Sequence, residues 1–140
     1  MGNRWRPDRL TEDYQSKLAC LQGAVTAQGG IVMNGSAWRS TEYQAHLQDI
    51  VRKDAEIRQR ATELKNLEEC TEVMSSVARE MSNHGLRPGQ AVAEPGRSRH
   101  ERGLAFDVTP RGLTSSQVNS IAEECKVSRQ AVPGEPWHFQ

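Results

Sequence analysis

Hydrophobic residues recur every three or four positions in several stretches of the chain, which predicts amphipathic helices. The first helix is expected over residues 10–28, where Thr11 can cap the start and two glycines follow the end. Another helix is expected from Thr114 to about residue 125, because Thr114 and Gln117 have the spacing of a capping box. The apolar positions of these two helices are Leu18, Leu21, Val25, Val118, Ile121 and Ala122.

The middle of the chain has the same period and a higher charge. Thr41 and Gln44 have the capping-box spacing and are expected to open a helix. Acids stand four residues before bases on its outer face, as in Asp49 and Lys53, which favours helix. Residues 42–83 form either one long helix or two with a break near residues 65–69. The apolar positions are Tyr43, Leu47, Ile50, Ile57, Ala61, Leu64, Val73, Val77 and Met81.

Short apolar runs between these stretches predict strands. One begins at Ile31 and runs toward residue 39, with a bend at Gly35. A second covers residues 104–108 and is expected to stop at Pro110, because proline cannot donate to a sheet ladder. Residues 127–132 could form a third strand, and a last one begins at residue 137 after a turn rich in glycine and proline.

Composition and charge exclude several classes of protein. The 140 residues include 18 basic and 18 acidic side chains, so no net field attracts the chain to nucleic acid. With 36% hydrophobic and 26% charged residues, a soluble globular fold is expected. No apolar run approaches the roughly 20 residues that span a bilayer, so we expect no membrane insertion.

The first residues and the cysteines bear on localisation. Met1–Asp8 are followed by no apolar segment and do not form a signal peptide. We therefore expect synthesis in the cytoplasm followed by release or export, or a chain from which a signal has been removed. Cys20, Cys70 and Cys125 are too widely spaced for a CxxC zinc knuckle and allow at most one disulfide. We expect three reduced, mostly buried thiols.

One region carries residue types suited to a metal site. His100 and Asp107 lie seven apart, so a straight strand would place them on opposite faces, but a turn at Gly103 can bring them together. Glu135 and His138 flank a predicted turn and can approach the same centre. Two imidazoles and one carboxylate are a common zinc set that leaves a position for water, whose pKa the metal lowers.

The remaining polar groups suggest what such a site would do. A spare carboxylate can take a proton from water and pass it to a leaving amine, and a cation such as Arg39 can stabilise a developing oxyanion. The competing interpretation is a satisfied core histidine with a few surface ones, and other divalent ions also accept this ligand set. His46, on a charged helix, is expected to be solvated, and His84 to favour the dipole at a helix end.

Three ordered blocks resemble one family. Ser-x-His-x-x-Gly-x-Ala-x-Asp at residues 98–107 and Glu-x-Trp-His at residues 135–138 resemble the zinc D-alanyl-D-alanine carboxypeptidase/dipeptidase family of peptidoglycan metallopeptidases. Its superfamily also holds phage L-alanyl-D-glutamate endopeptidases and the hedgehog zinc domain. Residues 93–96 resemble the family's lead-in, and residues 38–40 with Gln44 resemble its upstream motif. The stretch from 44 to 98 is long and charged for a small member.

The resemblance implies a role for each matching residue. His100, Asp107 and His138 would bind Zn²⁺, and Glu135 would be the general base. Arg39 would steady the tetrahedral intermediate or the substrate carbonyl. Two further residues, Ser98 and Trp137, would line the substrate pocket, and Gln44 would either brace the site or serve only as a capping residue.

The fold and function follow as expectations. We expect a single α+β zinc peptidase domain over residues 1–140, with a small, mainly antiparallel sheet that carries the zinc site and is packed by helices. It would be a monomeric zinc metallopeptidase that hydrolyses peptidoglycan stem peptides at the cell wall, most simply as a D-Ala-D-Ala carboxypeptidase or dipeptidase. The alternatives are a phage endolysin-type L-Ala-D-Glu endopeptidase, a non-hydrolytic zinc-binding interaction module, and a helical interaction protein built on residues 41–83.

Overall fold

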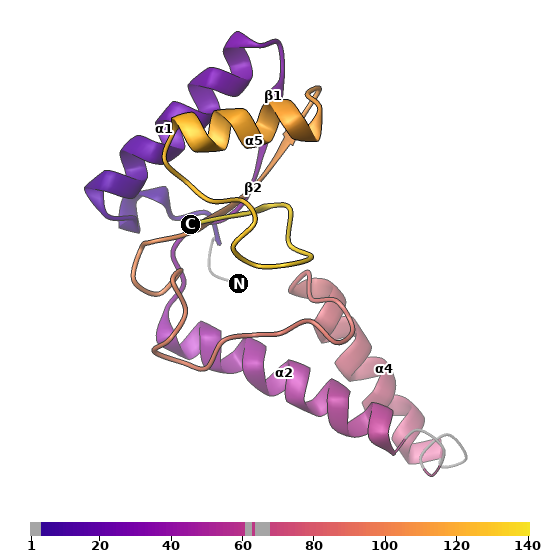
Figure 1. Cartoon of the computed structure of the whole chain (residues 1–140). Coiled ribbons are helices and arrows are strands. Elements are labelled where there is room, and N and C mark those ends of the chain that lie inside the picture. The colour runs from indigo at the N-terminus through magenta and orange to yellow at the C-terminus, as the bar shows by residue number, and fades with distance from the viewer. Residues whose placement is uncertain (1–3, 61–62, 64–67) are drawn as a thin grey trace. The chain divides into compact units, whose positions relative to one another are not determined.

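The computed structural model describes residues 4–60, 63 and 68–140, which divide into two compact units. Met1–Arg39 together with Arg99–Gln140 form the first, which we call the sheet unit, and Ser40–Ser98 form the second, the helical unit. Figure 1 shows the path of the chain through both. The prediction of one domain over residues 1–140 is not tested by this division and stays a prediction.

The sheet unit is built on a three-stranded antiparallel sheet in the order β1-β2-β3. The strands are β1 (Ile31–Ser36), β2 (Phe106–Arg111) and β3 (His138–Phe139), and the helices are a 3-10 turn η1 (Pro7–Arg9), α1 (Glu12–Ala27) and α5 (Ser115–Glu124). The two α-helices contact each other, and α1 contacts β1. The expected α+β class with a small antiparallel sheet is therefore confirmed.

Local sequence signals account for the helices of this unit. The Thr11 side chain accepts a hydrogen bond from the Tyr14 N–H and caps α1. Thr114 and Gln117 form the complete capping box that opens α5. The apolar faces of α1 and α5 bury Leu21, Val25 and Ile121 in a core shared with Phe106 and Phe139 of the sheet. Both predicted helices are confirmed.

The strands differ from expectation at two places. β2 continues through Pro110 to Arg111, because Pro110 pairs with Val32 on one side only and β3 reaches no further than Phe106 and Asp107. No strand forms over residues 127–132 in the described chain; only Ser128 pairs there, exchanging two backbone hydrogen bonds with Gln140. The bend in β1 is confirmed as a break in the pairing register between Asn34 and Ser36, at Gly35.

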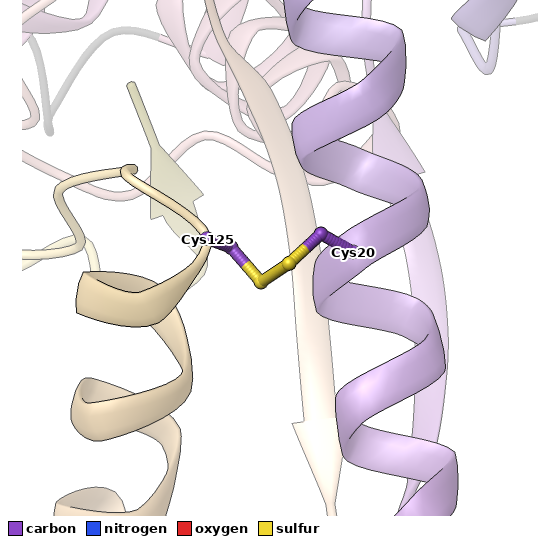
Figure 2. Close-up of a disulfide and its surroundings, with 2 residues drawn as sticks. All are labelled: Cys20 and Cys125. Carbon is purple, nitrogen blue, oxygen red and sulfur yellow. A yellow bond between two sulfur atoms is a disulfide. The ribbon is translucent and has the colours of Figure 1, made fainter.

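The expectation of three reduced thiols is wrong. Cys20 of α1 and Cys125, just after α5, form a disulfide, which Figure 2 shows bridging the two helices. Only Cys70 is a free cysteine. The two cysteines are 105 residues apart in sequence and meet only because α1 packs against α5, so no local pattern signals the bond. The bond closes a long loop and stabilises the fold chiefly by restricting the unfolded chain.

The helical unit consists of α2 (Thr41–Gln59) and α4 (Glu68–Asn83), which pack against each other (Figure 1). Two separate helices therefore form, as one of the two alternatives predicted; Ala61, Leu64 and most of the expected break lie outside the described residues. Among the described residues of these helices, the buried hydrophobic side chains are Leu47, Ile50 and Met81. No helix among the described residues is long and apolar enough to cross a membrane.

The predicted capping box of Thr41 and Gln44 is wrong. The N-cap is Ser40, whose hydroxyl accepts a hydrogen bond from the Tyr43 N–H, so Thr41 is already the first helical residue. The buried Gln44 side chain instead donates through Nε2 to the carbonyl of Ala93 at 2.8 Å. It thus holds the loop that follows α4 within this unit.

Candidate metal centre

The pairing of the sheet places three polar side chains in one row. Asp107 on the central strand lies opposite Ser36 of β1 and opposite His138 of β3. The register shift at Gly35 sets this alignment, and a Cβ on Gly35 would come within 2.8 Å of the Asp107 carbonyl oxygen. Glycine is therefore required where β1 approaches β2 most closely.

His100 reaches the same place from a turn. Backbone hydrogen bonds from Arg102 and Gly103 back to Arg99 and His100 form this turn, and Gly103 has a φ of 69°. A Cβ on Gly103 would meet the Arg9 carbonyl oxygen at 2.8 Å. The predicted turn at Gly103 is confirmed, and it explains how two residues seven apart share one centre.

Three side-chain atoms converge in this buried row. His100 Nε2 lies 3.2 Å from His138 Nδ1 and 3.2 Å from Asp107 Oδ1, and His138 Nδ1 lies 3.0 Å from the same carboxylate oxygen. Ligand atoms at about 2.0–2.1 Å from a tetrahedral zinc ion are separated by about 3.3 Å. The three separations have the size that a single small divalent ion requires.

In each imidazole one nitrogen, the inner one, belongs to the cluster, and the other, the outer one, has a hydrogen-bond partner elsewhere. His100 Nδ1 bonds to the carbonyl of Ala37 at 2.6 Å, and His138 Nε2 bonds to the side-chain oxygen of Gln140 at 3.0 Å. A carbonyl oxygen can only accept, so in each ring the proton belongs on the outer nitrogen. The inner nitrogens then keep their lone pairs for a metal ion, an arrangement typical of ligating histidines.

The second oxygen of Asp107 faces a cation. Arg39 Nη2 donates to Asp107 Oδ2 at 2.8 Å and to the Ser36 hydroxyl at 3.0 Å, and that hydroxyl donates to the same oxygen at 2.7 Å. The carboxylate is thus divided, with Oδ1 toward the imidazoles and Oδ2 toward Arg39 and Ser36. Arg39 Nε is buried without a hydrogen-bond partner among the described residues.

Burial and charge act on the pKa values of the cluster in different directions. Burial would raise the pKa of Asp107, but the hydrogen bonds that both imidazoles donate when their inner nitrogens are also protonated, together with the charge of Arg39, outweigh this and hold the pKa far below its ordinary range. Burial lowers the pKa of His100. For His138 burial is outweighed by the bonds to Asp107 and Gln140, and the pKa is raised. The Asp107 carboxylate is therefore ionised in the folded protein at neutral pH.

The other predicted site residues are placed as follows. Glu135 is half-buried in the turn before β3, accepts the His138 N–H with its carbonyl, and lies near enough for its charge to raise the pKa of His138. Trp137 accepts the Val108 N–H with its carbonyl and so joins the sheet. Ser98 is buried at the end of the helical unit. The base role of Glu135 and the pocket roles of Ser98 and Trp137 stay predictions, as does metal binding by the three converging side chains.

Sequence reasoning missed three contributors to this centre. Gln140 stands two residues after His138, a spacing that places both on one face of a strand, so a signal for it was present. Ser36 and the Ala37 carbonyl enter only through the pairing of β1 with β2 and the approach of the turn. No local pattern indicates either.

Comparison with known proteins places the chain among related sequences and folds. The family model described as VanY, D-alanyl-D-alanine carboxypeptidase, matches residues 7–133. A crystal structure of the vancomycin resistance D,D-pentapeptidase VanY from a VanB-type resistance cassette, a glutamate-to-alanine variant in complex with Zn(II), is similar at a TM-score of 0.55 and 23% identity. The match covers 94% of this chain and 71% of that one.

A second similar structure is VanYB in complex with D-alanine-D-alanine, also at a TM-score of 0.55 and 23% identity, with 94% of this chain and 70% of the other covered. At this identity the two structures support the fold. No curated protein matches the sequence significantly.

Proposed function

The chain belongs to the VanY D-alanyl-D-alanine carboxypeptidase family, and on that premise we propose that it hydrolyses the D-Ala-D-Ala end of peptidoglycan stem peptides at a zinc ion held by His100, Asp107 and His138. The observation that carries the proposal is the convergence of His100 Nε2, His138 Nδ1 and Asp107 Oδ1 within 3.2 Å of one another. Zn(II) in one similar structure and D-alanine-D-alanine in another support the metal and the substrate class.

The residues present fit zinc. Zinc readily accepts neutral imidazole nitrogens and a carboxylate oxygen as ligands, and both imidazoles are already oriented by Ala37 and Gln140. When bound, zinc would supply a Lewis acid that polarises the scissile carbonyl and favours ionisation of water. Asp107 stays ionised in the site because Arg39 and Ser36 donate hydrogen bonds to its second carboxylate oxygen, Oδ2.

Glu135 is the residue that we propose as the proton carrier. It stands three residues before His138, in the turn ahead of β3, and its charge acts on His138, although it does not belong to the ligand cluster. In that place it takes the proton of the attacking water and passes it to the amine of the departing D-alanine. Arg39 positions Asp107, while its predicted contact with the substrate carbonyl would use the remainder of its guanidinium group.

The test is mass spectrometry of defined muropeptides incubated with the zinc-loaded chain and, in parallel, with Glu135→Gln. We expect the pentapeptide to lose one terminal D-alanine, and the variant to retain zinc while losing at least a hundredfold in kcat, a loss typical of a removed general base. Cleavage between L-Ala and D-Glu instead would identify the endolysin-type endopeptidase. A zinc-loaded chain that leaves all stem peptides intact would support the interaction module.

Two further expectations belong to this proposal. The substrate implies that the chain acts on the cell wall, and we propose that it does so as a monomer. Sedimentation equilibrium over a hundredfold range of concentration checks the second point, because self-association through α2 and α4 would appear as a rising mass.

A further inference from the structure

The helical unit brings together a second set of metal-binding residue types. His46 on α2, Glu80 on α4 and His84 just after α4 each direct one ligand atom to a common place. His46 Nε2 and His84 Nε2 are 3.2 Å apart, and Glu80 Oε2 lies 3.3 Å from His84 Nε2 and 3.7 Å from His46 Nε2. All belong to the helical unit, and none contributes to the centre that carries the proposed peptidase activity.

These separations match those of ligands around one ion. Tetrahedral zinc with bonds of about 2.0–2.1 Å holds its ligand atoms about 3.3 Å apart. The second cluster has two separations close to this value and one that is slightly longer. Two imidazoles make the set suited to Zn²⁺, Co²⁺ or Ni²⁺ and unsuited to Mg²⁺ or Ca²⁺, which prefer oxygen ligands alone.

The helices hold these residues in place. Glu80 and His84 are four apart, so they project from one side of the end of α4, and the adjoining Gly85 has a φ of 64° that ends the helix there. Tyr43 and His46 are three apart on α2 and face the same cluster. The Tyr43 hydroxyl bonds to His84 Nδ1 at 2.8 Å. When Nδ1 carries the proton, His84 Nε2 keeps its lone pair for the ion.

Burial separates the three ligands into an inner and an outer part. The His84 side chain is only 8% exposed, although it lies at the end of α4. The side chains of His46 and Glu80 are 48% and 44% exposed, so an ion could enter from solvent and a water molecule could complete its coordination. Without an ion, two imidazole nitrogens at hydrogen-bond distance need a proton between them.

We propose that His46, Glu80 and His84 form a second binding site for a divalent transition-metal ion, with Zn²⁺ as the ion to test and Tyr43 as the residue that orients His84. An ion here would cross-link α2 to α4. Among the described residues of these two helices, the buried hydrophobic side chains are Leu47, Ile50 and Met81, so such a link would contribute substantially to holding the helices together.

The test counts zinc ions on the full chain. Protein stripped with a chelator is reloaded with Zn²⁺, separated from free metal, and measured by elemental analysis. We expect two equivalents in the wild type and one in His46→Ala, which replaces an exposed side chain and whose fold is verified by circular dichroism. Glu72→Gln, which changes another acid on α4, serves as the matched control and should retain two equivalents.

The background Asp107→Ala separates this site from the peptidase centre. In that variant we expect one equivalent of zinc and a rise in Tm on its addition, both lost when His46→Ala is added. If Asp107→Ala binds no zinc while the wild type binds one equivalent, the second site does not exist and the cluster is a hydrogen-bonded histidine–glutamate network. Two equivalents retained in His46→Ala would also overturn the proposal.

Discussion

The Arg39 guanidinium is joined to Asp107 through Nη2 and Oδ2 at 2.8 Å, on the side of the carboxylate that faces away from both imidazoles. Both side chains are largely buried. The pair therefore fixes which oxygen of Asp107 points to the proposed metal position. Arg39 would thus act on the proposed metal centre through Asp107, in addition to the substrate contact predicted for it.

Arg39→Ala should lower zinc affinity about 10- to 100-fold, because loss of a group that orients a ligand typically has this effect. Arg39→Lys should recover part of the affinity, since it returns the charge without the planar fork. Competition with a chromophoric chelator measures the zinc Kd. If Arg39→Ala changes kcat alone and leaves the zinc Kd unaltered, Arg39 serves only the substrate.

Gln140→Ala should also weaken zinc binding about 10- to 100-fold, since His138 Nε2 loses its acceptor and the ring its orientation. Gln140→Glu retains an acceptor and should restore most of the affinity. The same chelator competition applies, with circular dichroism to verify the fold. Equal affinities for the wild type and Gln140→Ala would mean that the sheet alone orients the ring.

Gly35→Ala should destabilise the sheet unit by about 1–3 kcal/mol, because its Cβ would lie 2.8 Å from the Asp107 carbonyl oxygen, a backbone atom that cannot turn aside. Zinc affinity should fall with it. Gly23→Ala is the matched control: it lies in α1 with nothing within 4 Å, and should stabilise by about 0.5–1 kcal/mol. Urea unfolding gives both values, and equal stability of the two variants would contradict the close approach.

Replacement of both Cys20 and Cys125 by alanine should lower the free energy of unfolding by about 2–4 kcal/mol, because the bond closes a loop of about a hundred residues in the unfolded chain. A reducing agent should shift the wild type in the same direction. Cys70→Ala, at the free cysteine, should respond to reductant as the wild type does. A wild-type Tm that is indifferent to reductant would contradict the prediction.

Acid should release zinc from the peptidase centre. Zinc competes with protons for the imidazoles. Burial lowers the pKa of His138, but the bonds to Asp107 and Gln140 outweigh it and raise this pKa above the ordinary value. The protonated ring therefore persists to higher pH than usual. As the pH is lowered, the zinc affinity should start to decrease while the pH is still above about 6.5. Zinc titrations from pH 8 to 5 check this, and a constant Kd would contradict it.

Local chemistry decided how much of the fold was predictable. Thr11 and Thr114 were identified correctly because a cap depends only on the next three residues. Thr41 was not, because the adjacent Ser40 offers an equivalent hydroxyl one residue earlier. Pro110 was wrongly expected to end β2. Proline is tolerated there because β3 does not extend to it, and the local sequence does not reveal where β3 ends.

Some residues of the candidate site could likewise be predicted from local sequence, and others could not. His100, Asp107, Glu135 and His138 lie in motifs that carry their own chemistry, and the turn at Gly103 follows from the backbone freedom of glycine. Ser36 and the Cys20–Cys125 bond arise from contacts between segments far apart in the chain. The cluster of His46 with His84 likewise requires the packing of α2 on α4, which periodicity indicates only in outline.

The Arg39 N–H donates to the His100 carbonyl at 3.3 Å, so the chain leaves the sheet unit and returns to it at neighbouring points. The helical unit, Ser40–Ser98, is therefore an insertion between these two neighbouring points of the sheet unit. A piece joined in this way can be lengthened, shortened or exchanged for another while Asp107 and both histidines keep their supports.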